Sequence, residues 1–153
     1  VAGGIAKNLK VGDIIISTSL VQHDFDITAF NHPKGYIPNI GNNIPIDNKL
    51  LNTTKTILDT NNISYKEGLI ASGDIFCTKE SMATKINTQF NALCVEMEGA
   101  SIAQTAYLSK TPCLVIRSIS DCPDNNNKVT YEEFLETSSN KVAQIMYAIL
   151  IKQ

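Results

Sequence analysis

Charged and hydroxyl side chains stand at the end of an apolar run. Residues 113–116 have the composition of a buried strand, and Arg117, Ser120 and Asp121 follow at once. Ligand sites of open α/β sheets lie beyond the carboxyl ends of parallel strands, which is where these groups would meet a small molecule. A Ser-Asp pair also makes turns and helix caps. Residues 123–127 already supply turn-forming side chains, so we expect the three polar groups to serve a site.

Two more carboxylates follow a second short apolar run, residues 93–95. Glu96 and Glu98 are both candidate substrate-binding residues, although the dipole of a following helix favours acidic side chains in its first turn whatever else they do. Two residues apart on a helix, they cannot share a face. We therefore expect only one of them to point into the site. Glu98, with the small Gly99 beside it, is the better placed, and Glu96 would then be structural.

Phe76 and the first residues of the chain extend the candidate site. Phe76 follows residues 72–74, where serine, glycine and aspartate end a strand-like run. Its ring is either a core aromatic or a platform for a planar ligand, with nearby backbone groups reaching the ligand edge. Residues 1–4 predict a tight glycine turn, in which the backbone of Ala2 and Gly3 approaches a substrate or an anion.

Other reactive side chains lack the spacing that their chemistry needs. Asp24 and Asp26 would share one face of an extended segment, and two carboxylates without a third ligand make a weak metal site. The cysteines lack zinc-type spacing, and no serine stands in a nucleophile elbow. We therefore predict no metal site and no acyl transfer.

The composition favours a small-molecule partner. A net charge of -2 over 153 residues gives no concentrated basic surface for nucleic acid or anionic lipid. The apolar runs are far shorter than the roughly 20 residues of a membrane span, and no signal pattern opens the chain. Widely spaced thiols in a chain this apolar are typical of a reducing compartment. We predict a soluble, cytoplasmic protein with one domain, residues 1–153.

Strand and helix patterns alternate along the chain. Strands are expected over 13–18, 68–73, 93–95 and 113–121, and the proline- and glycine-rich stretch 21–46 predicts an extended excursion with at most a short strand over 26–30. Helices are expected from an Asp47 cap to about Thr60, after a Thr78 cap, over 97–108, and from a Thr130 capping box onward. The alternation predicts an α/β fold with a mixed, mostly parallel sheet that is covered by helices on both faces.

Five segments together resemble the methylthioadenosine/S-adenosylhomocysteine nucleosidases: residues 2–4, 23–30, 68–74, 95–98 and 117–121. The resemblance implies a three-layer nucleoside phosphorylase-like fold, a homodimer, and cofactor-free hydrolysis of the bond between adenine and ribose. The implied substrates are 5'-methylthioadenosine, S-adenosylhomocysteine and related 5'-deoxyadenosines. Two alternatives stay open, namely a phosphate-dependent purine nucleoside phosphorylase and a noncatalytic nucleoside-binding or dimerising domain.

The resemblance divides the candidate residues between the two halves of a nucleoside. It implies that Asp121 protonates adenine at N7 and that Ser120 helps to orient it. Glu98 would bind the ribose hydroxyls, Met97 would pack against the sugar, and Phe76 would stack on adenine. Protonating the base while a carboxylate stands near the sugar suits a transition state with oxocarbenium character.

Further roles follow from the same resemblance. The backbone of Cys77 would hold the edge of adenine. Ile27, Phe30 and Pro38 would reach across a dimer to the partner's site, where Tyr131 helps to wall an apolar pocket for the 5'-alkylthio group. An apolar tail gains transfer free energy in such a pocket.

The resemblance also predicts that the chain begins inside the fold. Members of the family carry a further N-terminal segment, which holds the first strand and a glutamate that activates water. They commonly carry serine at the position of Val1.

Overall fold

The computed structural model describes residues 1–123 and 127–151. Its strands are β1 (Ala2–Gly4), β2 (Ile14–Gln22), β3 (Ile44–Pro45), β4 (Lys66–Ser72), β5 (Ala92–Glu96) and β6 (Ile116–Asp121). Its helices are α1 (Asn48–Thr60), α2 (Glu80–Phe90), α3 (Gly99–Leu108) and α4 (Asn127–Leu150), with a 3-10 helix at Thr28–Phe30. The α/β fold predicted from the alternating patterns is confirmed.

Across the described residues the strands form one six-stranded sheet in the order β3-β2-β4-β5-β1-β6. Strands β2, β4 and β5 run parallel, while β1 runs antiparallel to β5 and parallel to β6. The start of β2 also pairs with β6, because Ile14 and Ile16 lie opposite Ser118 and Ile116. Five strands therefore close into a ring. The described sheet is mixed, with as many antiparallel as parallel pairings, so it is less parallel than the alternation predicted.

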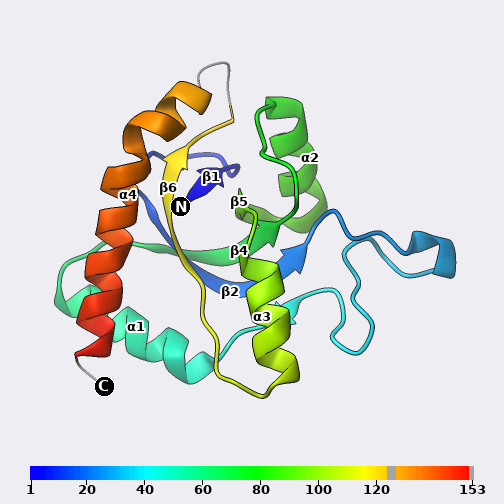
Figure 1. Cartoon of the computed structure of the whole chain (residues 1–153), viewed down its shortest axis with the longest axis horizontal. Helices are drawn as coiled ribbons and strands as arrows, with labels where there is room; N and C mark the ends of the chain where they lie inside the picture. Colours follow the sequence, from blue (N-terminus) through cyan, green and yellow to red (C-terminus); the bar gives the residue numbers. More distant parts are fainter. Residues whose placement is uncertain (124–126, 152–153) are drawn as a thin grey trace.

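The alternation of side chains along β2 divides the core between the two faces of the sheet. Ile14 and Ile16 pack outward with Leu58 of α1 and Ile145 of α4. Ile15 points the opposite way and belongs to a second cluster, which includes Ile70 of β4 and Ala103 of α3. In Figure 1, α4 runs beside β6, α2 lies beside β5, and α3 crosses β2 and β4, which it contacts. Helices thus cover the sheet on both faces.

The stretch after β2 leaves the sheet as an extended excursion, as its prolines and glycines predicted, and it projects to the right in Figure 1. The short strand expected over 26–30 is wrong. Asp26 Oδ1 accepts a hydrogen bond from the Thr28 amide at 2.9 Å, and this local bond starts the 3-10 helix instead. The excursion ends at β3, where Ile44 pairs with Leu20 of β2.

Three predicted starts need correction. Residues 1–4 do not make a tight turn, because strands β5 and β6 offer partners on either side and Ala2–Gly4 become strand β1. Helix α2 begins at Glu80 without a side-chain cap, so the Thr78 cap is wrong. Helix α4 begins at Asn127, before the predicted Thr130, whose side chain lies outside the described part of the chain.

Helix α1 confirms the prediction made from its cap. Asp47 Oδ1 accepts a hydrogen bond from the Leu50 amide at 2.7 Å, and Ile57 and Leu58 are buried. The strands expected over 68–73 and 93–95 are confirmed as β4 and β5. Among the described helices, none combines the length and the apolar content that crossing a membrane requires.

Candidate active site

A pocket that is partly open to solvent lies where β1, β5 and β6 meet the loop after β4. Every predicted site residue lines it except Ile27, Phe30 and Pro38. The walls are formed by Val1, Ala2, Gly3, Ile75, Phe76, Cys77, Val95, Glu96, Met97, Glu98, Arg117, Ser120, Asp121 and Tyr131. The sequence-based reasoning missed Val1, Ile75 and Val95. All three side chains are apolar. The sequence signal that could have found them is that each adjoins a predicted site residue.

The register of strand β1 brings the two acidic strand ends together. Gly3 pairs with Val95 of β5 on one side and with Asp121 of β6 on the other. The prediction placed both ends at one edge of a parallel sheet, but β6 runs antiparallel to β2 and therefore opposite to β5. The two ends meet because β1 is short and lies between them. A Cβ on Gly3 would stand 3.4 Å from Asp121 Oδ2, so glycine leaves room beside the carboxyl group.

Asp121 ends strand β6 inside the protein, with 1% of its surface exposed. The Ser120 hydroxyl donates a hydrogen bond to Asp121 Oδ1 at 2.8 Å. This contact fixes one oxygen of the carboxyl group and leaves the second directed toward Gly3. A buried carboxyl group held in this way is suited to exchanging a proton with a bound ligand.

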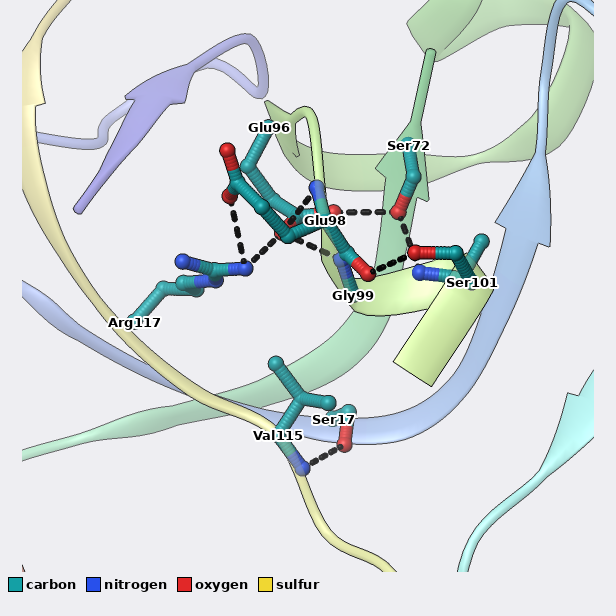
Figure 2. Close-up of polar contacts among 9 residues, drawn as sticks. Ser17, Ser72, Glu96, Glu98, Gly99, Ser101, Val115 and Arg117 are labelled. Atoms are coloured by element: carbon teal, nitrogen blue, oxygen red, sulfur yellow. Dashed lines mark hydrogen bonds and ion pairs between the residues drawn. The ribbon is translucent and has the colours of Figure 1, made fainter. Parts of the chain in front are cut away.

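Glu96, Glu98 and Arg117 form one charged network (Figure 2). The Arg117 guanidinium bonds to the buried Glu96 carboxylate, and the same nitrogen lies 3.2 Å from Glu98 Oε2. Burial lowers the pKa of Arg117. Both glutamates border the pocket, but the Glu98 side chain is 60% exposed and that of Glu96 only 2%, which agrees with the expectation that one of them faces the site. The expectation assumed that both lie on a helix, whereas Glu96 ends strand β5 and Glu98 stands at the N-cap position of α3.

Glu96 also holds the start of helix α3. Its Oε2 accepts hydrogen bonds from the Gly99 amide at 2.7 Å and the Glu98 amide at 3.2 Å. These amides belong to the group that an α-helix leaves without internal partners at its N-terminus. Glu96 is therefore structural as predicted, and it borders the pocket at the same time.

An aromatic and thioether wall lies opposite the polar groups. The rings of Phe76 and Tyr131 meet edge to face, with centroids 5.4 Å apart and an interplanar angle of 71°. Met97 and Phe76 remain 43% and 39% exposed, so their apolar surfaces are open to a ligand. Cys77 lies beside them, and burial raises the pKa of its thiol. Such a wall suits a planar, weakly polar group.

Ile27, Phe30 and Pro38 lie on the excursion, away from this pocket. Phe30 is 74% exposed, which is unusual for a large apolar side chain. Nearby, His23 is buried, and this burial lowers the pKa of its imidazole. Within the described residues, no group of three His, Cys, Asp or Glu side chains stands close enough together to hold a metal ion.

Comparison with known proteins places the chain in a family. The family model of the phosphorylase superfamily matches residues 1–151. The chain belongs to the phosphorylase superfamily. A curated superfamily relative, the aminodeoxyfutalosine nucleosidase of Helicobacter pylori, is 40% identical over 150 residues, which cover 98% of this chain and 65% of the relative. The 5'-methylthioadenosine/S-adenosylhomocysteine nucleosidase of Haemophilus influenzae is 39% identical over 97% of this chain and 66% of its own length.

A solved structure from the superfamily also matches this chain in three dimensions. The crystal structure of a Helicobacter pylori MTAN mutant with 5'-methylthioadenosine in the active site superposes with a TM-score of 0.96 at 38% identity. The superposition covers 100% of this chain and 66% of the Helicobacter pylori chain. The chain thus spans about two thirds of the length of the superfamily members that it matches.

Proposed function

We propose that these residues form the nucleoside-binding site of an adenine nucleosidase. The proposed reaction is hydrolysis of the N-glycosidic bond of 5'-substituted adenosines, with release of adenine and without a cofactor. One observation carries the proposal. Two carboxylates from separate strand ends, Asp121 and Glu98, line a single pocket together with the open face of Phe76.

The chemistry of the bond explains why both carboxylates are needed. Adenine leaves poorly as an anion, and its departure leaves positive character on the ribose. We assign Asp121 as the acid that protonates the base at N7, with the Ser120 hydroxyl orienting its carboxyl group. Burial of Asp121 keeps bulk water away from this proton. Such general acid catalysis contributes about 10²- to 10⁴-fold to a rate.

We assign binding of the ribose half of the substrate to Glu98. Its side chain lines the pocket, is 60% exposed, and lies 3.2 Å from the Arg117 guanidinium. A carboxylate accepts hydrogen bonds from a vicinal diol, and its charge favours the cationic sugar of the transition state. Met97, next in the chain and also on the pocket wall, is assigned to the face of the sugar.

Substrate preference is assigned to the apolar side of the pocket. Phe76 is proposed to stack on adenine with the Cys77 backbone at its edge, and Tyr131 to wall the 5'-substituent. This pairing favours thioether or deoxy tails, as in 5'-methylthioadenosine, S-adenosylhomocysteine and 5'-deoxyadenosine, over a 5'-phosphate that would be desolvated without a matching charge. The name of one relative adds aminodeoxyfutalosine to this class.

The assembly and the compartment are part of the proposal. Ile27, Phe30 and Pro38 stand on an excursion that does not line its own pocket. We assign them to the pocket of a second copy in a homodimer. Four thiols, two of them buried, support a reducing compartment, which we take to be the cytoplasm.

The test is release of adenine from 5'-methylthioadenosine by the protein and its Asp121→Asn variant. We expect the variant to lose at least about 100-fold in kcat while it still binds substrate, because asparagine keeps the shape but has no proton to give. Unchanged turnover in the variant would falsify the assignment of the acid.

Two further measurements separate the alternatives. A requirement for phosphate, with ribose phosphate as a product, would identify a phosphorylase instead of a hydrolase. Binding of adenine and 5'-methylthioadenosine in a calorimeter without any turnover would identify a nucleoside-binding domain. If the wild-type protein binds neither adenine nor 5'-methylthioadenosine, both the nucleosidase and the nucleoside-binding domain are contradicted.

A further inference from the structure

Ser72 ends strand β4 just behind the pocket wall. It is 3% exposed and does not line the pocket. Its hydroxyl has two partners, the Glu96 carboxylate and the Ala100 amide, which donates to Ser72 Oγ at 2.7 Å. A hydroxyl carries a single hydrogen, so Ser72 accepts from Ala100 and must donate to Glu96. The direction of the hydrogen bond to Glu96 is thereby fixed.

The fixed Glu96 carboxylate in turn restricts the position of Arg117. With Oε1 bonded to Ser72, its Oε2 meets the Gly99 amide and the Arg117 guanidinium (Figure 2). A Cβ on Gly99 would stand 2.9 Å and 3.0 Å from the two carboxylate oxygens, so the carboxylate rests directly on the backbone. It therefore has little freedom to turn.

Arg117 in turn holds the exposed carboxylate of the pocket. The side chain of Arg117 is 16% exposed and that of Glu98 is 60% exposed, with 3.2 Å between Arg117 Nη2 and Glu98 Oε2. An exposed carboxylate on a flexible side chain loses rotamer freedom when it binds a ligand. A partner that is already fixed reduces this loss.

We propose that Ser72 is a positioning residue for recognition of the ribose. It orients Glu98 through Glu96 and Arg117 without touching the substrate. The inference rests on the proposed function, in which Glu98 binds the ribose hydroxyls. Its consequence is selective, because Ser72 supports the sugar side of the pocket and leaves the adenine side to Phe76 and Asp121.

Ser72→Ala tests the proposal through two ligands, adenine and 5'-methylthioadenosine, whose Kd values are measured by calorimetry. We expect the variant to bind 5'-methylthioadenosine about tenfold more weakly, since a hydrogen bond to a charged group is lost from the network. Its Kd for adenine, which has no ribose, should stay within about twofold. Ser72→Thr keeps the hydroxyl and should restore ribose recognition.

A double-mutant cycle identifies the path. In a Glu98→Gln background the ribose contact is already weakened, so Ser72→Ala should add little further loss. If Ser72→Ala does not fold, Glu96→Gln tests the next link and should give the same ribose-selective loss. A matched control is Ser17→Ala. This serine is also buried, but its hydroxyl accepts the Val115 amide at 3.0 Å, apart from the network.

The outcomes are distinguishable. A loss of equal size for adenine and 5'-methylthioadenosine, or full additivity with Glu98→Gln, would overturn the inference while the proposed function stands. A wild-type protein that binds neither ligand would overturn the proposed function and this inference together. Ser17→Ala should reduce the free energy of unfolding without changing the ratio of the two Kd values.

Discussion

At Arg117 a positive charge is held between a buried and an exposed carboxylate. The Glu96 side chain is 2% exposed, and the guanidinium supplies the positive charge beside its carboxylate. We predict that Arg117→Met lowers the free energy of unfolding by about 3–5 kcal/mol, as expected when one partner of a buried pair is removed. Adding Glu96→Gln should return part of that loss. Urea unfolding of the two single variants and the double variant measures the coupling free energy between Arg117 and Glu96. Strictly additive losses would contradict this account.

Cys94 gives the fold a defined response to alkaline pH. Complete burial raises the pKa of its thiol from 9.0 to about 12. An unfolded chain ionises this thiol above pH 9 while the native protein keeps it protonated, so the stabilising effect is full below pH 9 and is lost as pH rises toward 12. The expected slope is at most about 1.4 kcal/mol per pH unit.

The measurement is urea unfolding of the wild type and of Cys94→Ala between pH 8 and pH 12. The variant should be less stable at pH 8 because it loses core packing, and its stability should fall less steeply above pH 9. Parallel curves for the two proteins would show that Cys94 does not titrate differently in the folded and unfolded states.

The charged residues that line the pocket were predictable because charged groups after apolar runs are conspicuous in a sequence. The convergence of Glu96 and Glu98 on Arg117 was not predictable from the sequence. It depends on where β5 ends and α3 begins, and a shift of two residues in that boundary moves Glu96 from a helix to a strand. The apolar wall residue Ile75 carried no signal of its own.

At the scale of elements, the bend after β4 sets the position of Phe76. The His23 amide donates to Ser72 O at 2.9 Å, and the Asp74 amide donates to Asp24 Oδ2 at 2.8 Å. Between them the buried His23 ring lies against Gly73, where a Cβ would stand 2.3 Å from His23 Nε2. Only glycine permits this approach.

We predict that Gly73→Ala destabilises the protein by about 1–3 kcal/mol, the range for overpacking a core, and weakens adenine binding because the loop that carries Phe76 must move. His23→Ala should relieve the collision, so the double variant should be more stable than the sum of the single losses implies. Denaturant unfolding with adenine calorimetry provides the check. A Gly73→Ala protein with wild-type stability would refute the close packing.

Most elements were predictable from local pattern, because apolar period and capping residues are properties of short segments. Helix α1 followed from Asp47 and its apolar face, and β4 and β5 from their β-branched and apolar runs. Strand β1 was not predictable. Its glycines favour turns, and only the partners on either side, which come from distant parts of the chain, make it a strand.

For the whole molecule, the proposed homodimer gives a direct prediction. Phe30 is 74% exposed on the excursion, and a charge there would oppose its burial in a partner's pocket. Phe30→Asp should sediment as a monomer under conditions in which the wild type is a dimer. Its adenine release should fall with dissociation. Asn52→Asp on the exposed side of α1 is the control for added charge, and equal sedimentation of wild type and Phe30→Asp would contradict the assignment.

The α/β class was predictable from alternating strands and helices, but the closure of the sheet was not. Pairing of Ile14 and Ile16 with Ser118 and Ile116 joins segments about a hundred residues apart. Sequence patterns report which side of a strand is apolar and do not report which distant strand it meets.

The closed ring also bears on how firmly Asp121 is held. Strand β6 pairs with β2 through residues 116–118 and with β1 through Ile119 and Asp121, and the Ile119 amide donates to Asp13 O at 2.9 Å just before β2 begins. Because each part of β6 is bonded to a neighbouring strand, we expect its amides to exchange hydrogen with solvent more slowly than those of the excursion. Ser120 and Asp121 lie where β6 borders β1, so opening of that pairing is the local motion that we expect to disturb their alignment.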